Sequence, residues 1–246
     1  MAVSPIVSFG IPLLAAALAN VFVLAVNAAE RELGTPARLR ARRVALAALG
    51  VFAWMALTAA LALRGTLADF DALPPPMLLV MASAPALSLG VGLSTVGERL
   101  ARGLPLVSMV AIQGFRLPLE LMMHQAARDG LMPTVMSYSG YNYDIVSGIT
   151  AALLGGLLAV GRVPLWLVAA WNALGIALLL TIVGIAVAAS PMLRAFGEQQ
   201  VNAWVTRFPY VWMVVMVTAA GLGHVVLTRR LIFDYRAQRA AAQGSR

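Results

Sequence analysis

The sequence contains no cysteine and no lysine, and it carries little charge. Its 18 basic residues are all arginines, and only 11% of its 246 residues are charged, against roughly a quarter in an ordinary soluble chain. The lack of cysteine excludes disulfides, thiolate metal sites, iron–sulfur clusters and covalently attached haem. The lack of lysine excludes Schiff-base chemistry of the retinal or pyridoxal type.

Long apolar runs take the place of charge, since 61% of the residues are hydrophobic. A hydrocarbon core needs about 20 apolar residues in each crossing helix. The sequence therefore predicts an all-α fold, a polytopic membrane bundle of seven transmembrane helices in a single domain over 1–246, with a frayed tail at 237–246. The seven predicted spans are 5–27, 44–64, 76–95, 104–127, 145–161, 163–190 and 208–229.

The arginines predict the direction in which the chain crosses the membrane. One side of the predicted spans carries Arg31, Arg38, Arg40, Arg42, Arg43, Arg99, Arg102, Arg162, Arg229, Arg230, Arg236, Arg239 and Arg246, and the other only Arg64, Arg128, Arg194 and Arg207. Basic loops stay in the cytoplasm, so we expect an N-terminus outside and a C-terminus inside a bacterial inner membrane. The net charge of +8 is then a topology signal. The expected partners are membrane lipids and other membrane subunits or further copies of this chain, and not nucleic acid.

The fourth predicted span contains "FRLPLELMMH", an unusual run for a membrane helix. At 100° per residue, Gln113, Arg116, Glu120 and His124 fall within an arc of about 80°. A charged group near the bilayer centre costs at least about 2.5–3.5 kcal/mol, so this stripe is predicted to face the bundle interior or a water-filled cavity. Arg116 and Glu120 are spaced for an ion pair within the helix.

A second polar group follows outside the fourth span. Asn142 and Asp144 stand at the beginning of the fifth predicted span, where a carboxylate can cap a helix. Since the fourth span ends on the side where the fifth begins, we expect Glu120, His124, Asn142 and Asp144 to meet at the outer boundary.

Three interpretations of this polar cluster remain open. Its residues can form a structural lock of ion pairs and hydrogen bonds. They can form an outward-facing site for a small molecule, an ion or a proton. Glu120, His124 and Asp144 can also be ligands of a metal ion, because Glu120 and His124 lie four residues apart on one helix face.

The chain has only two histidines, which bears on a haem cofactor. His124 is expected about 30 Å above the inner end of its span, at 1.5 Å per residue, and His224 near the inner surface. A single haem between the two histidines is therefore not expected, and no other cofactor is indicated. His224 is a secondary site candidate with a packing role as its default. Asn172, deep in the sixth span, predicts an interhelical hydrogen bond or a substrate contact.

Five short motifs resemble those of an uncharacterised bacterial family of seven-span integral membrane proteins. The motifs are F-R-x-x-x-E at 115–120, G-x-N-x-D-I-x-x-G-x-T-A at 140–151, W-N-x-x-G at 171–175, F-P-x-V-W at 208–212 and G-H at 223–224. The resemblance covers the C-terminal half. It implies that Arg116, Glu120, Asn142, Asp144, Asn172 and His224 belong to the part that defines the family, and it implies no activity.

The sequence thus favours a non-enzymatic membrane protein that binds or conducts a small molecule, ion or proton through an outward-facing polar site. The expected site residues are Gln113, Arg116, Glu120, His124, Asn142, Asp144 and Asn172. One alternative is an accessory or structural subunit of a larger membrane complex. A second alternative is a metal-dependent membrane enzyme acting on a lipid or quinone.

Overall fold

The computed structural model describes residues 3–161 and 163–244, and within these ranges the chain forms helices and no β-strand. Arg162 and Arg246, two of the arginines that predict the topology, lie outside the described residues. Among the described residues, six helices are long and apolar enough to cross a membrane. They are α1 (Pro5–Glu32), α2 (Ala37–Leu63), α3 (Pro76–Leu93), the continuous stretch Leu106–Arg128, α8 (Leu165–Ala188) and α9 (Met213–Gly244) with the single 3-10 turn η6 (Tyr210–Trp212) before it.

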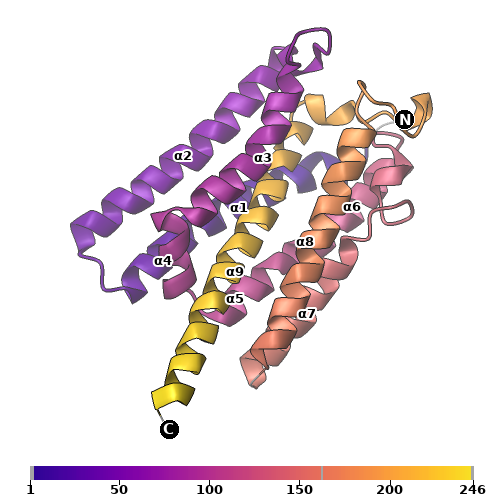
Figure 1. Cartoon of the computed structure of the whole chain (residues 1–246). Helices are drawn as coiled ribbons and strands as arrows, with labels where there is room; N and C mark the ends of the chain where they lie inside the picture. Colours follow the sequence, from indigo (N-terminus) through magenta and orange to yellow (C-terminus); the bar gives the residue numbers. More distant parts are fainter. Residues whose placement is uncertain (1–2, 162, 245–246) are drawn as a thin grey trace.

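These helices form one elongated bundle around α1 and α9 (Figure 1). The most extensive helix pair is α3 with α9, and α9 also packs against α1, α8 and the short helix α4 (Thr95–Gly103). The N-terminus and the C-terminus lie at opposite ends of the bundle (Figure 1). α9 remains helical to Gly244, through most of the segment for which the sequence predicts a frayed tail.

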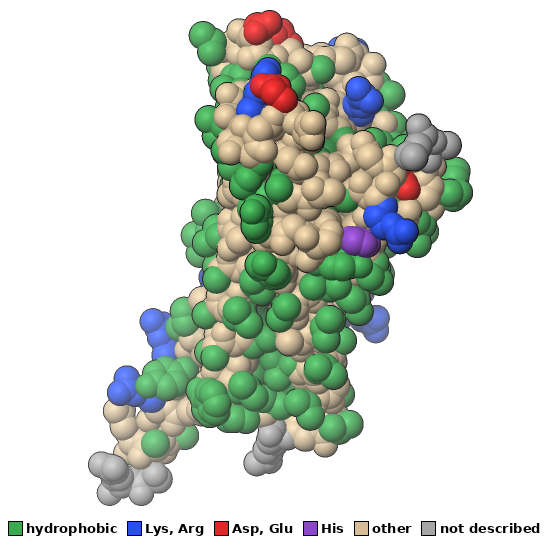
Figure 2. Space-filling model, turned by 90° about the vertical axis from the view of Figure 1, so that its right-hand side faces the viewer, with side chains coloured by type: hydrophobic (Ala, Val, Ile, Leu, Met, Phe, Trp, Pro, Cys, Tyr) green, Lys and Arg blue, Asp and Glu red, His purple; other side chains and the backbone are tan. Residues whose placement is uncertain are grey.

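The outer surface of the bundle is apolar along much of its length. Large hydrophobic side chains such as Phe9, Leu63 and Trp166 are at least 70% exposed, which a soluble monomer avoids over so wide an area. In Figure 2 hydrophobic side chains cover much of the lower half of the visible face, and the charged side chains lie mainly near its top and along its edges. The protein is therefore a multi-pass, α-helical membrane protein.

The predicted fourth span changes helix type near its middle. It consists of α5 (Leu106–Ala111), the 3-10 turn η2 (Ile112–Phe115) and α6 (Arg116–Arg128). Pro118 has no N–H to donate to the carbonyl of Gly114, so a regular α-helical bond is lost at this point. The tighter turn comes directly before the proline, where Arg116 begins α6.

The predicted fifth span is a short helix, α7 (Ile145–Val160). Its 16 residues extend over about 24 Å at 1.5 Å per residue, less than the hydrocarbon core of about 30 Å. Gly148 of α7 lies against Leu117, and Gly155 lies against Ala111. α7 thus runs antiparallel to α5 and α6 and begins level with the first turns of α6, well short of the C-terminal end of α6.

A folded loop, 129–144, fills the space beside the C-terminal turns of α6 that the short helix α7 does not reach. Its Ser137 and Asn142 are fully buried, and its 3-10 turn η3 (Thr134–Met136) packs against α6 and α8. Irregular backbone is tolerated at membrane depth where protein surrounds it.

At the start of this loop the backbone N–H of Ser4 donates to Asp129 at 2.8 Å and lowers the pKa of that carboxyl from its ordinary value.

Candidate functional site

Two polar contacts join α6 to the beginning of α7. Arg116 Nη1 lies 2.8 Å from Asp144 Oδ1, and Asn142 Nδ2 donates to Glu120 Oε2 at 2.7 Å. All four residues are at most 4% exposed. Arg116 and Glu120 are spaced for an ion pair along one helix, but in the structure both take their hydrogen-bond partners from the loop and helix that follow.

Asn142 uses both ends of its amide. Its Nδ2 also donates to the Met136 carbonyl at 3.0 Å, and its Oδ1 accepts the Asp144 N–H at 3.0 Å. Asp144 stands at the N-cap of α7, as predicted, but its side chain makes no capping hydrogen bond. The cap prediction fails because the Asp144 carboxylate turns to the guanidinium of Arg116.

The charges of this cluster do not cancel by themselves. It contains the guanidinium of Arg116 and the carboxyl groups of Glu120 and Asp144, so with both carboxyls ionised it carries a net charge of −1. An uncompensated charge in a low-dielectric interior is costly. One proton on Glu120, or one monovalent cation beside it, would make the cluster neutral.

Arg116 has donors that no neighbour uses. Its Nη1 is 3.4 Å from the Gly175 carbonyl of α8, whereas its Nε and Nη2 are buried without a hydrogen-bond partner in the described part of the chain, as are Gln113 Oε1 and His224 Nε2. Leaving such groups unsatisfied costs about 1–3 kcal/mol each. Buried polar atoms of this kind usually meet water or a ligand.

Asn172 and His224 form a separate group between α8 and α9. His224 Nδ1 and Asn172 Oδ1 are 2.8 Å apart, and Asn172 Nδ2 donates to Thr228 Oγ1 at 2.8 Å. Gln113 joins α9 by donating to the Ala220 carbonyl at 3.3 Å. His224 also lies close to Arg116, because both contact Gly175. The interhelical hydrogen bond predicted for Asn172 is present.

His124 stays outside both groups. It is partly exposed, its ring stacks on Tyr138 with 4.3 Å between centroids, and its Nδ1 is 3.3 Å from Ser139 Oγ. Within residues 3–161 and 163–244, no three His, Asp or Glu side chains are placed to hold a metal ion together. The proposed ligand set of Glu120, His124 and Asp144 is therefore not assembled.

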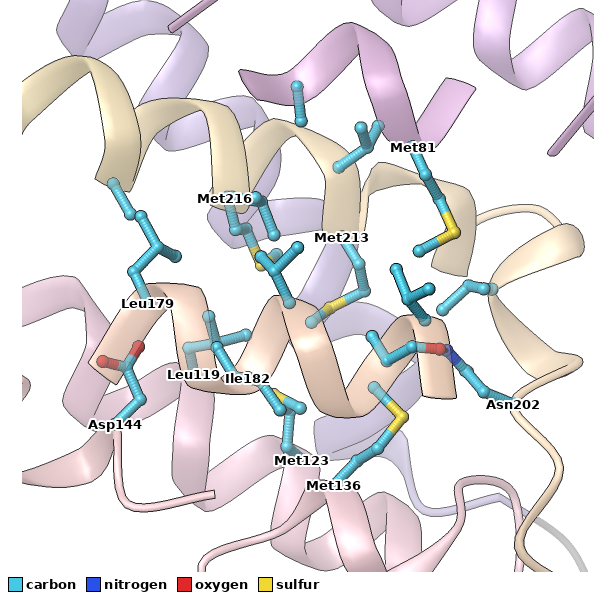
Figure 3. A pocket seen from close by; sticks show the side chains of 18 of the residues that line it. Met81, Leu119, Met123, Met136, Asp144, Leu179, Ile182, Asn202, Met213 and Met216 are labelled. Atoms are coloured by element: carbon cyan, nitrogen blue, oxygen red, sulfur yellow. Dashed lines mark hydrogen bonds between the residues drawn. The ribbon is translucent and has the colours of Figure 1, made fainter. Parts of the chain in front are cut away.

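A cavity of about 420 Å³, here named the central cavity, adjoins the Arg116 cluster. Four helices line it, namely α3, α6, α8 and α9. It exists because α3, α6 and α8 pack against other helices and form no extended contact with one another. Figure 3 shows Asp144 at one end of the cavity and Asn202 at the other, with Leu119 and Ile182 between them.

The wall of the central cavity is apolar except near its ends. Arg116, Glu120 and Asp144 lie at one end, and the rest is mainly aliphatic and rich in methionine. The lining methionines are Met77, Met81, Met123, Met136, Met213 and Met216, and all but Met77 are labelled in Figure 3. Methionine is flexible and polarisable and adapts to irregular guests. Sequence reasoning did not identify these methionines, nor Asn202 and Trp204 of the loop before α9, as cavity residues. Their spacing resembles ordinary packing and carries no signal for a cavity.

Comparisons with protein-family models, curated proteins and solved structures give no match. The resemblance to an uncharacterised seven-span family therefore stays a prediction. The arrangement of Arg116, Glu120, Asp144 and the central cavity is the basis on which a function can be inferred.

Proposed function

We propose that this protein binds a small, largely apolar molecule in the central cavity, with one polar group of that molecule directed at Arg116. The protein would cross a bacterial inner membrane seven times, with its N-terminus outside and its C-terminus in the cytoplasm. The arginine distribution supports this orientation, and the position of the two termini at opposite ends of the bundle supports an odd number of crossings.

The observation that carries the proposal is the pair of unused Arg116 donors beside a cavity. A volume of about 420 Å³ lies within the range of about 300–1,000 Å³ typical of small-molecule sites, which are mostly apolar with a few placed polar groups. Since Nε and Nη2 of Arg116 are donors, the matching group on the ligand is an acceptor.

Charge balance disfavours an anionic ligand, and it favours a neutral molecule once a proton on Glu120 neutralises the cluster. Arg116 is already paired with Asp144, and Glu120 adds a second carboxyl, so an anionic ligand would meet unfavourable charge. A carbonyl or hydroxyl oxygen accepts from a guanidinium without adding charge. A proton on Glu120 would then be bound together with the ligand, which accommodates both the small-molecule and the proton functions expected from the sequence.

The Arg116–Asp144 and Glu120–Asn142 contacts also tie α6 to α7, so the structural lock is part of the same arrangement. If the protein were an accessory subunit, it would need only these structural contacts and no ligand in the central cavity. No observation favours a metal-dependent enzyme, because the three candidate ligands are not brought together in the described part of the chain.

The test is native mass spectrometry of the protein extracted gently from bacterial membranes, followed by solvent extraction and identification of any bound molecule. Ala186 lines the central cavity, whereas Ala177 of the same helix is exposed and does not line it. We expect a neutral apolar compound on the wild type and on Ala177→Phe, and its loss from Ala186→Phe.

Two results would contradict the proposal. A compound retained equally by Ala186→Phe and Ala177→Phe binds elsewhere. A wild-type chain of 25.9 kDa without any small molecule, but with a second protein attached, would favour the accessory subunit.

A further inference from the structure

A second cavity lies on the other side of the bundle, beside α2. The buried residues of α2, namely Met55, Thr58 and Ala62, all belong to its C-terminal half, and its first 18 residues include none. α2 packs along α1 but makes no extended contact with α3, α4 or α9, and it lies at the edge of the bundle (Figure 1). The N-terminal half of α2 therefore has one unfilled side.

That side holds a cavity of about 490 Å³, here named the lateral groove. Its walls come from α1, α2, α3, α4 and α9 and are apolar over most of their length, and they include Phe22, Leu46, Gly50, Trp54, Leu87 and Leu222. Gly50 faces open space, since an added Cβ there would meet no atom within 4 Å.

One end of the lateral groove is ionic. Glu30 of α1, which is only 3% exposed, pairs with Arg43 of α2 at 2.9 Å and with Arg99 of α4, and Thr35 donates to the same carboxylate. Glu30, Arg43 and Arg99 all line the groove. Two arginines and one glutamate leave a net charge of +1 at this end.

The guanidinium groups of Arg43 and Arg99 both have N–H donors that Glu30 does not use and that a second anion could accept from. Arg43 reaches Glu30 through Nη1, and Arg99 reaches Glu30 and Thr35 through Nε and Nη2. In the described part of the chain, no hydrogen bond uses the other N–H groups of these two residues. Their side chains are 37% and 30% exposed, so they are accessible at the mouth of the groove.

The length of the lateral groove indicates which kind of molecule can fill it. From Arg43 to Trp54 it extends over 11 residues of α2, or about 17 Å at 1.5 Å per residue. This is close to half of a hydrocarbon core of about 30 Å, hence one leaflet. A helix of a partner protein would need the full thickness, but α2 closes onto the bundle beyond Met55.

We infer that the lateral groove binds one anionic phospholipid of the cytoplasmic leaflet. An acyl chain lies along Phe22, Gly50 and Trp54, and the phosphate accepts hydrogen bonds from Arg43 and Arg99. Arginine is suited to this role because its planar fork binds phosphate oxygens through several donors. The basic segment at 38–43 raises the local concentration of anionic lipids.

The experiment is native mass spectrometry of purified protein in mild detergent, titrated with phosphatidylglycerol or, separately, phosphatidylcholine of the same acyl chains. We expect one phosphatidylglycerol to be retained at high activation energy. We expect phosphatidylcholine to bind about tenfold more weakly, because the quaternary ammonium of its headgroup cancels the phosphate charge that the net positive end of the groove attracts.

Two pairs of variants locate the lipid. Gly50→Phe fills the lateral groove, and Gly184→Phe is its control, because Gly184 also has open space around it but lies on α8 away from the groove. Arg43→Gln removes a headgroup contact, and Arg42→Gln makes the same change on an exposed neighbour that does not line the groove. Phosphatidylglycerol binding should weaken about tenfold in Gly50→Phe and Arg43→Gln and stay unchanged in the two controls.

The inference is overturned if Gly50→Phe and Gly184→Phe retain the lipid equally, since the lipid then lies elsewhere on the surface. Equal binding of the two lipids, with no effect of Arg43→Gln, would overturn the anionic headgroup. If Gly50→Phe does not fold, the inference is still tested by comparing phosphatidylglycerol binding to Arg43→Gln with its binding to Arg42→Gln. The neutral ligand of the central cavity should persist in all four variants, which separates this test from the proposed function.

Discussion

At the scale of single residues, Arg116 is held by a carboxylate 28 positions away in the sequence and not by the one four positions away. Both Asp144 and Glu120 are buried near it. Helical spacing favours Glu120, but the loop 129–144 delivers Asp144 to the guanidinium and Asn142 to Glu120. Arg116 and Glu120 each depend on a partner from another element. The Arg116–Asp144 and Glu120–Asn142 contacts can therefore be removed separately by mutation.

We predict that Arg116→Leu lowers the free energy of unfolding by about 3–5 kcal/mol, because it leaves the Asp144 carboxylate buried without its partner. Adding Asp144→Leu should recover much of this loss, since an apolar pair needs no compensation. Unfolding in graded detergent mixtures, followed by circular dichroism, measures each free energy. Simple addition of the two single losses would contradict the pairing.

A matched control comes from a surface ion pair. Arg102 lies 2.9 Å from Glu98, and their side chains are 54% and 40% exposed. Exposed pairs contribute about 0–1 kcal/mol. Arg102→Leu should therefore change the free energy of unfolding far less than Arg116→Leu, although both substitutions remove one arginine.

At the scale of elements, α7 depends on close backbone contact with α6. A Cβ placed on Gly148 would lie 2.4 Å from the backbone nitrogen of Leu117, a rigid atom, whereas Gly156 of the same helix has open space around it. Small residues at such contacts let membrane helices approach closely. The approach of α7 to α6 brings Asp144 within reach of Arg116.

We predict that Gly148→Ala lowers the free energy of unfolding by about 1–3 kcal/mol through overpacking. Gly156→Ala should be neutral or raise it by about 0.5–1 kcal/mol, because alanine is the better helix former. The same detergent unfolding measures both. Equal effects of the two substitutions would mean that α7 does not pack on α6 as closely as described.

Element boundaries show where the sequence is informative. Apolar runs predict the six long helices, because burial in lipid requires about 20 apolar residues. The same runs place the start of the second helix near residue 44, whereas α2 begins at Ala37. The arginines of 38–43 are good helix formers in water, so the helix extends beyond the membrane part that hydropathy detects.

The polar stripe shows both the strength and the limit of local patterns. Gln113, Arg116 and Glu120 are each 1% exposed, as their helical spacing predicts, while His124 at the end of the stripe lies in a partly exposed stack on Tyr138. The partners of these residues depend on how far the loop 129–144 descends beside α6. No spacing within one helix encodes that depth.

At the scale of the whole molecule, the role of α7 decides the topology. The six long helices suffice for an even number of crossings, and α7, with its 16 residues, makes the number odd only if it and the loop 129–144 together complete a crossing. With seven crossings and the proposed external N-terminus, Gly161 is cytoplasmic and Gln199 is external. With six crossings the two residues exchange sides, so that Gly161 is external and Gln199 is cytoplasmic.

The natural lack of cysteine makes single-cysteine variants clean reporters of this choice. Asp71, Gly161, Gln199 and Gln243 are exposed positions at successive ends of the bundle. We predict that a membrane-impermeant maleimide labels Asp71→Cys and Gln199→Cys in intact spheroplasts, and Gly161→Cys and Gln243→Cys only after permeabilisation. Labelling of Asp71→Cys and Gly161→Cys from outside, with Gln199→Cys protected, would mean that α7 turns back within the membrane. The C-terminus would then be external, and the arginines of the tail would no longer be a topology signal.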